Sequence, residues 1–274
     1  MSTYNLSYCR EFLLLILLSL HLLTLPNFPQ RRQTLHEFEK YYQKAQEDTL
    51  SLQTRIRLLK IAYEALKDAK RDSLTYSRIS KIVELSSQLE DSIFFQNAAS
   101  EGLKLAHVLN NPSLIADAHW NYGSYYLTKK KFDSSYYHYD AAYKLFTAAK
   151  KNYYAGKMLY NMAYISSQTN DFTGAEILLF RCIKNFEKAE NYKQLYLCYN
   201  LLGTNADDME EYKKALEYYT QADQFIPKFN NSQYYQLELW NNMGVRLHKI
   251  GRYAHAISYF DRALFYKETL NSHP

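Results

Sequence analysis

Three asparagines recur at nearly constant spacing in the second half of the chain. Asn121, Asn161 and Asn242 each stand two residues before a small residue, whereas Asn200 stands three residues before its own. A side-chain amide offers one acceptor and two donors, which matches a peptide unit of any sequence. Helix interiors mildly disfavour asparagine, so three in register call for a reason. Two interpretations stay open: the amides bond a ligand backbone, or each bonds its own helix or a neighbour.

The asparagines belong to a residue pattern that returns four times at a spacing of 40 or 41 residues, with its small residue at positions 123, 163, 203 and 244. The plainest copy reads Trp240-x-x-Met243-Gly244-x-x-Leu247, then Gly251, Tyr253 and Ala256-x-x-x-Phe260-x-x-Ala263. The first four of these places form one apolar stripe on a helix, and the small residue lets a partner helix come close. A fixed period of this length predicts a stacked array in which neighbouring units cover each other.

Composition favours an all-α fold. The chain has 274 residues, 47% of them hydrophobic, with seven Gly and five Pro, fewer turn residues than a sheet protein of this length needs. We expect about six antiparallel helix pairs: 36–47 with 50–70, 73–87 with 92–108, 113–129 with 134–150, 153–168 with 173–189, 192–207 with 212–229, and 233–249 with 253–270.

Polar residues mark the expected helix ends. Thr34-x-x-Glu37 and Thr173-x-x-Glu176 have the form of capping boxes. Breaks recur at asparagines, which tolerate the left-handed conformation that ends a helix. These breaks are Asn111-Pro112, Asn152, Asn191, Asn231 and Asn271.

The four copies resemble the tetratricopeptide repeat, a helix–turn–helix unit that stacks into a right-handed superhelix. The resemblance covers 113–270 well and 35–110 loosely. The family's usual period is ~34 residues, so about six extra residues lengthen each pair, as in the long variants of peptide-sensing regulators and kinesin light chains. The chain departs from the pattern in three respects: only Trp240 fills the Trp place, Ala163 replaces Gly, and Ser135 replaces Ala.

This resemblance implies that the asparagine places line a concave groove and bond the backbone of an extended peptide, with aromatic rings adding contact area at low entropic cost. The resulting candidate groove residues are Trp120, Asn121, Tyr160, Asn161, Tyr164, Asn200, Thr204, Asn241 and Asn242. We therefore expect a non-catalytic scaffold that binds a protein or peptide. The alternative is the exported sensor portion of a bacterial signal-transduction regulator, either a histidine kinase or a transcription regulator, whose output domain is absent from this chain.

No catalytic constellation accompanies the repeats. The chain has no Gly-rich phosphate loop, no His-Glu-x-x-His and no Gly-x-Ser-x-Gly motif. His248 and His255 are separated by the turn at Gly251 and lack a third ligand, so we predict no metal site and no cofactor. The net charge of +5 comes from short basic clusters at helix ends rather than a continuous stripe, so we expect no nucleic-acid partner.

The N-terminus is a separate segment. The run from Phe12 to Leu25 is apolar apart from a serine and a histidine, and it would span only ~21 Å as a helix against a hydrocarbon core of ~30 Å. That length favours a signal peptide. Because Glu11 offsets Arg10 and no Ala-x-Ala site follows, an uncleaved anchor and a buried first helix remain alternatives.

These readings predict three parts: 1–29 as signal peptide or membrane anchor, 30–110 as degenerate helix pairs, and 111–274 as four repeats at 113–150, 153–189, 192–229 and 233–270. We expect an exported, periplasmic or membrane-anchored bacterial protein that meets the membrane only through its N-terminal segment.

Two further features concern contacts between repeats. Cys182 and Cys198 fall on helices that pack together in the resembling family, so the alternatives are a disulfide, if the protein is exported, and two buried thiols. The final helix, 254–270, is apolar on more than one side where an array would carry a polar cap. We expect a partner or a second copy to cover it, or the chain to be the front part of a longer protein.

Overall fold

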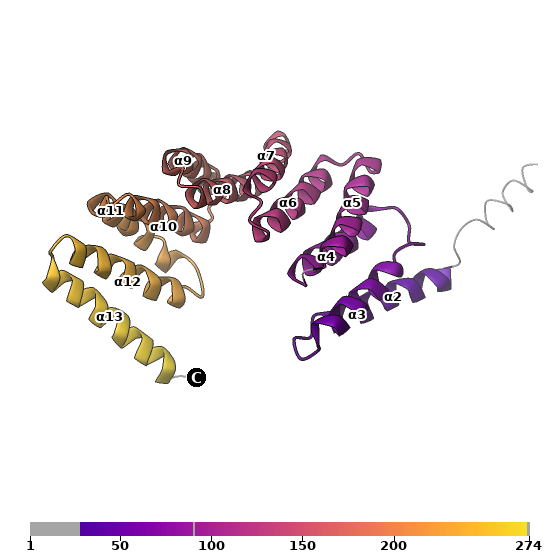
Figure 1. Ribbon diagram of the computed structural model, residues 1–274, viewed down its shortest axis with the longest axis horizontal. Coiled ribbons are helices and arrows are strands. Elements are labelled where there is room, and N and C mark those ends of the chain that lie inside the picture. The colour runs from indigo at the N-terminus through magenta and orange to yellow at the C-terminus, as the bar shows by residue number, and fades with distance from the viewer. Residues whose placement is uncertain (1–27, 90, 273–274) are drawn as a thin grey trace, which may run out of the picture. The chain divides into compact units, whose positions relative to one another are not determined.

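The computed structural model describes residues 28–89 and 91–272, with side-chain environments from residue 36 to residue 267. The described residues form consecutive helices and no strand (Figure 1). The predicted all-α fold of stacked antiparallel helix pairs is therefore confirmed. The chain divides into two compact units between Leu105 and Ala106, and the predicted division at residues 29 and 110 stays a prediction.

The first unit contains α2 (Phe28–Ala45), α3 (Leu52–Glu64), α4 (Ser73–Gln88) and most of α5 (Ser92–Val108). Because α2 begins at Phe28, the capping box predicted at Thr34 and Glu37 is wrong. Glu101 on α5 accepts hydrogen bonds from the Tyr63 hydroxyl of α3 at 2.5 Å and from Arg71 Nη1 at 2.7 Å. These bonds hold α5 against α3 and the connection that follows it.

The predicted leader, including Phe12 to Leu25, lies outside the described residues, so its role stays a prediction. Of the helices from α2 onward, none combines the length and the apolar character needed to cross a membrane.

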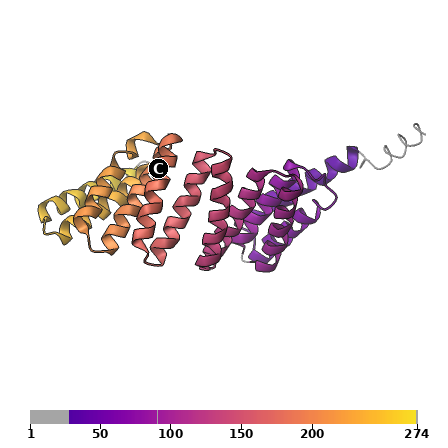
Figure 2. The same ribbon diagram turned by 90° about the horizontal axis from the view of Figure 1, so that it is seen from above.

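The second unit holds four helix pairs, named here the first to the fourth pair: α6 (Pro112–Thr128) with α7 (Phe132–Ala148), α8 (Asn152–Gln168) with α9 (Phe172–Lys188), α10 (Tyr192–Asp208) with α11 (Tyr212–Asp223) and the short 3₁₀ helix η1 (Ile226–Lys228), and α12 (Gln233–Lys249) with α13 (Tyr253–Ser272). From α6 to α13, each α-helix contacts the next α-helix along the chain (Figure 2). From α6 to α10 every helix has 17 residues and three residues connect it to the next, which explains the 40-residue period.

From α5 onward the connections between successive α-helices also repeat, with a left-handed residue in each. The residues with positive φ are Asn110, Lys130, Lys150, Asn170, Glu190, Glu210, Asn231 and Gly251. The backbone N–H of the next residue donates to a carbonyl near the helix end, as Lys131 N does to the Tyr126 carbonyl at 2.9 Å. This bond satisfies a carbonyl that the helix itself leaves unpaired. The recurring break is thus real, but it is not carried by asparagine alone.

Of the asparagines predicted to be left-handed, Asn231 is confirmed. Asn111 and Asn191 stand one residue later and act as N-caps of α6 and α10, where their side-chain oxygens accept backbone N–H groups. Asn152 is the first residue of α8 and Asn271 lies inside α13, so these two predictions are wrong.

Two predicted helix boundaries also differ. Asp171, not Thr173, caps α9, because its Oδ1 accepts the N–H of Gly174 at 2.9 Å. The helix predicted over 212–229 stops at Asp223 and resumes as η1, where Pro227 lacks the N–H that a continuing α-helix needs.

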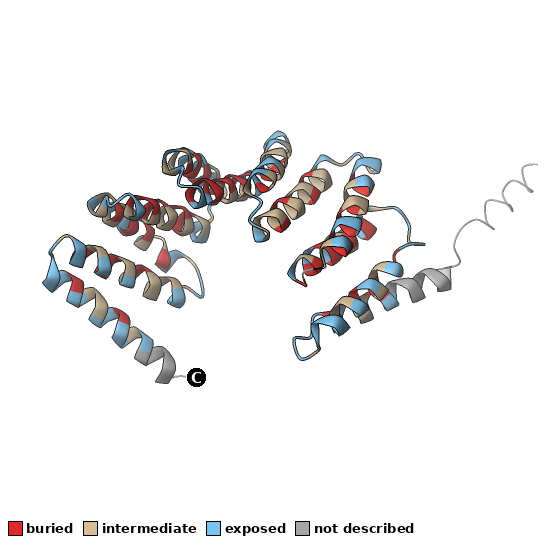
Figure 3. Cartoon of the chain, in the orientation of Figure 1, coloured by how far each residue is buried: buried red, intermediate tan, exposed pale blue. Residues whose placement is uncertain are grey.

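Glycine lets the two helices of a pair approach closely, as predicted. In three pairs a glycine of the first helix lies against a ring of the second: Gly123 against Tyr139, Gly203 against Tyr219, and Gly244 against Phe260. A Cβ at these glycines would lie 2.6, 2.4 and 2.6 Å from the rings, too close for a real atom. In the second pair the equivalent places hold Ala163 and Leu179, both buried. A leucine in place of the ring leaves room for the methyl group of the alanine. Buried residues accordingly collect on the facing sides of the helices, most densely in α8 (Figure 3).

Candidate functional site

All nine predicted groove residues lie on α6, α8, α10 and α12, the first helices of the four pairs. Trp120, Tyr160, Asn200 and Asn241 occupy one place of the repeat, and Tyr164 lies one helical turn after Tyr160. Tyr164 and Asn241 are exposed, and the other seven are half-buried. The structure therefore sets them in one row along the first helices of the four pairs. Their binding role stays a prediction.

Trp120, at the α6 end of the row, is covered by neighbouring side chains. Lys157 Nζ lies 4.9 Å from the centre of its ring, in cation–π geometry, and the edge of Tyr154 packs against it with ring centres 6.2 Å apart. Burial, with the nearby positive charge of Lys193, lowers the pKa of Lys157. A ligand reaching this ring would displace or join the lysine.

Tyr160 belongs to the row and also packs against the buried core of the unit. Burial is the main reason that its pKa is raised, and the neighbouring thiols of Cys198 and Cys182 add to the effect. The phenol therefore stays neutral and can donate or accept a hydrogen bond.

Asn200 and Thr204 form the third step of the row. Thr204 Oγ1 donates to the backbone carbonyl of Asn200 at 3.1 Å and lies 3.5 Å from the Tyr219 hydroxyl. The side-chain oxygen of Asn200 is shielded from solvent and has no hydrogen-bond partner among the described residues. An unpaired acceptor of this kind costs about 1–3 kcal/mol, which a ligand donor would recover once the amide rotates outward.

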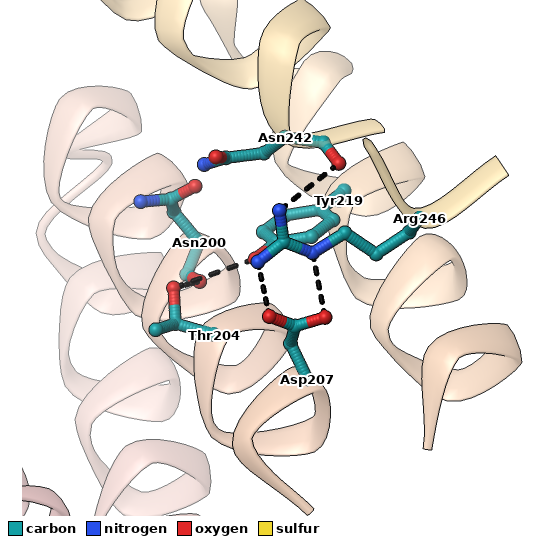
Figure 4. A network of polar contacts seen from close by, with 6 residues as sticks. All are labelled: Asn200, Thr204, Asp207, Tyr219, Asn242 and Arg246. Atoms are coloured by element: carbon teal, nitrogen blue, oxygen red, sulfur yellow. Dashed lines mark hydrogen bonds and ion pairs between the residues drawn. The ribbon is translucent and has the colours of Figure 1, made fainter. Parts of the chain in front are cut away.

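Sequence reasoning missed an ion pair beside this step. Arg246 on α12 binds Asp207 on α10 through two hydrogen bonds, with Nε to Oδ1 at 2.7 Å. Its Nη1 also donates to the Asn242 carbonyl at 3.4 Å, and its guanidinium lies 5.8 Å from the centre of the Tyr219 ring. Figure 4 shows the side-chain amides of Asn200 and Asn242 on the same side of this ion pair. The pair fixes the spacing of two steps of the row, but it occurs at one junction only, so no repeated signal revealed it.

Asn241 and Asn242 open onto a groove of about 600 Å³ between α12 and α13. Its wall also contains Glu238, whose pKa is raised by burial, and Lys267. The groove thus offers amide donors and acceptors, a carboxyl group and an ammonium group next to the apolar Phe260. The structure brings Asn241 and Asn242 to one groove and places Asn242 beside Asn200 (Figure 4), and it does not gather all nine residues into one cavity.

A histidine pair in the first pair of helices was also missed. His119 Nδ1 and His138 Nδ1 lie 3.0 Å apart, and the Tyr122 ring stacks on His138 with centres 4.9 Å apart. Burial lowers the pKa of His119 and brings that of His138 to about 4. Both rings are therefore neutral near pH 7. No group of three or more His, Cys, Asp or Glu residues suited to a metal ion occurs in the described part of the chain.

The geometry defines an all-α array of helix pairs whose first helices carry a row of amide and aromatic side chains. Residues 196–229 and 237–268 match the sequence model of the tetratricopeptide repeat family. The third and fourth pairs therefore carry the sequence pattern of the tetratricopeptide repeat, and the resemblance predicted from sequence is confirmed. None of the curated protein sequences matches the chain.

Several solved structures share this fold. BtubC (BKLC) from P. vanneervenii is similar with a TM-score of 0.69 at 18% identity, covering 86% of this chain and 94% of that one. Aspartyl phosphate phosphatase F from Bacillus subtilis gives 0.62 at 15% identity, covering 87% and 69%. A Rap protein in complex with competence and sporulation factor gives 0.59 at 14% identity, covering 87% and 76%. At these identities the similarity shows the fold alone.

Proposed function

We propose that this chain is a non-catalytic repeat scaffold that binds an extended protein or peptide segment in a concave groove, which the row of side chains on α6, α8, α10 and α12 would line. One observation carries the proposal: the same place in the first helices of four successive pairs holds Trp120, Tyr160, Asn200 and Asn241, side chains able to bond or stack on a peptide. Asn241 is exposed, and the amide oxygen of Asn200 has no partner among the described residues. Core packing alone explains neither the exposure of Asn241 nor the unpaired amide oxygen of Asn200.

The comparisons support this class of function. The third and fourth pairs match a repeat family, and one solved structure of the same fold is a complex of a Rap protein with competence and sporulation factor. Carrying that binding role over to this chain is part of the proposal.

The test is binding of a labelled peptide library, followed by titration of the tightest peptide. We expect Asn161→Ala combined with Asn241→Ala to weaken binding about tenfold or more, because two side-chain amides are removed from the row. Asn185→Ala is the matched control, since Asn185 lies on the second helix α9 and bonds the carbonyl of Arg181 on that same helix. Unchanged affinity in the double variant, or equal loss in the control, would contradict the assignment.

A second candidate is the sensor portion of a signal-transduction regulator whose output domain lies outside this chain. The fold similarity to aspartyl phosphate phosphatase F favours it. Pull-downs from the source organism that recover a kinase or a response regulator would support this candidate. Turnover of an aspartyl phosphate by the purified chain would contradict the non-catalytic part of both proposals.

The proposal extends to the compartment and to α13. We propose export or membrane anchoring through residues 1–29, which N-terminal sequencing and cell fractionation test. On α13, Ile257 and Phe265 are 59% and 72% exposed, a large apolar area for one helix face. We propose that a partner or a second copy covers this face. Sedimentation of the chain alone and with its partner distinguishes the two occupants.

A further inference from the structure

Cys182 on α9 and Cys198 on α10 meet at the junction between the second and third pairs. Their Sγ atoms lie 3.2 Å apart, both residues are 0% exposed, and both thiols are free. A disulfide bond is ~2.05 Å long, so the two sulfurs need to approach by only about 1 Å.

The surroundings leave little other chemistry for this pair. Cys182 Sγ donates to the Gly156 carbonyl of α8 at 3.2 Å, and both cysteines pack within the apolar core. No third metal-binding side chain joins them in the part of the chain that the structure describes. A pair of thiols in an apolar pocket, aligned sulfur to sulfur, is poised for one reaction, oxidation to a disulfide.

We propose that Cys182 and Cys198 are a disulfide-forming site that closes by exchange with a small-molecule disulfide such as oxidised glutathione. The thiolate of one cysteine attacks a glutathione sulfur, which gives a mixed disulfide and releases one glutathione. The thiolate of the second cysteine then attacks the protein sulfur of that mixed disulfide and releases the second glutathione. The protein loses two electrons and two protons, and glutathione disulfide gains them as two thiols.

Burial determines when this exchange takes place. The apolar surroundings raise the pKa of the Cys182 thiol, so the folded junction holds little thiolate, which is the attacking species. A pocket without solvent exposure also has no room for bound glutathione. Closure therefore belongs to folding of the chain or to local opening between α9 and α10.

The bond would join two successive repeats. Cys182 and Cys198 are 16 residues apart, so closing this loop restricts the unfolded chain and stabilises the contact of α9 with α10. This consequence does not depend on any ligand, so it stands or falls separately from the proposed function.

The experiment uses the full chain with Cys9→Ser, which leaves Cys182 and Cys198 as its only cysteines. The protein is refolded with oxidised and reduced glutathione, and non-reducing peptide mapping is combined with thiol titration under denaturing conditions. We expect a peptide that links the two residues, a mass lower by two hydrogens, and no titratable thiol. The melting temperature should rise by about 5–10 °C over that of the reduced protein.

Cys198→Ala in the same background is the control, and its melting temperature should not respond to the glutathione mixture. Two thiols that still titrate after refolding, or oxidation that yields only glutathione adducts or linked dimers, would overturn the proposal. Peptide mapping of the Cys9→Ser protein shows whether the disulfide forms even if the control variant folds poorly.

Discussion

Two junctions between helix pairs use the same places of the repeat for different chemistry. The first junction joins the third and fourth pairs, and the second joins the second and third pairs. In the former, Arg246 reaches back to Asp207 and the two charges pair through two hydrogen bonds. In the latter, the place of Arg246 is taken by Asn205, which is 2% exposed with neither amide atom bonded within the described residues. The place of Asp207 is taken by Ser167, which donates to the Ala163 carbonyl of its own helix at 3.0 Å.

The comparison shows what a repeat does and does not impose. The repeat period fixes which side chains occupy equivalent places, because helix lengths and connections are constant from α6 to α10. It does not fix whether a polar group that points into a junction finds a partner there. Stability in an array is close to a sum over repeats and junctions, so the two junctions should respond differently to substitution.

Loss of the Arg246 side chain should have the largest effect. In Arg246→Ala the carboxylate of Asp207 stays mostly buried without its partner, and breaking a buried pair costs about 3–5 kcal/mol. Because both side chains keep some exposure, we expect about 2–4 kcal/mol, measured as the change in free energy of unfolding in urea.

Arg181→Ala is the matched control. Arg181 is exposed on α9 and bonds the hydroxyl of Tyr143 at 3.0 Å, so its loss should stay within about 0.5 kcal/mol. Equal losses in the two variants would mean that the ion pair adds nothing to the junction.

Gly203→Ala tests the contact of helices within a pair and should cost about 1–3 kcal/mol. The new methyl would lie 2.4 Å from the Tyr219 ring, which must move away. The second pair already shows the remedy, since Ala163 there faces Leu179 by register. We therefore expect Gly203→Ala combined with Tyr219→Leu to cost less than the sum of the single changes, as a double-mutant cycle would show. Additive costs would contradict the direct contact.

Asn205→Leu should have the opposite sign. It replaces an amide with no partner by an apolar side chain of similar size, like Ile165 at the same place of the second pair. Removing an unsatisfied buried group should stabilise the chain by about 1–2 kcal/mol in urea unfolding. A loss of stability would show that the amide is bonded in solution, by water held in the junction.

These expectations rest on features that the sequence predicted to different degrees. Helix pairs, their order and the close contact at Gly203 and Gly244 follow from the 40-residue pattern, because each repetition confirms the others. Helix ends were less predictable: Lys130 and Glu190 adopt the left-handed conformation although neither type favours it, since the short connection demands it.

The site divides in the same way. The row of predicted residues on the first helices follows from register. The pairing of Asp207 with Arg246, and of His119 with His138, does not, because each pairing joins two helices at one place only. A contact without repetition leaves no periodic signal in the sequence, so only the structure reveals it.

The smallest predicted effect compares the first pair with the second. The places of His119 and His138 are taken by Leu159 and Leu178 in the second pair, so the first pair has two imidazoles where the second has aliphatic side chains. Only one proton can lie between the two Nδ1 atoms, which are 3.0 Å apart, and two protonated rings would point N–H groups at each other.

Stability should therefore fall on acidification. The pKa of His138 is about 4 in the folded chain, below the ordinary 6.5, and that of His119 is also lowered. The unfolded chain thus binds protons first as the pH falls below about 6.5, and the loss grows until the folded rings titrate near pH 4. Because the rings are partly exposed, we expect about 1 kcal/mol or less between pH ~7 and pH ~5 in urea unfolding. His119→Leu combined with His138→Leu, which copies the second pair, should remove most of this dependence. An unchanged slope in that variant would place the titrating groups elsewhere.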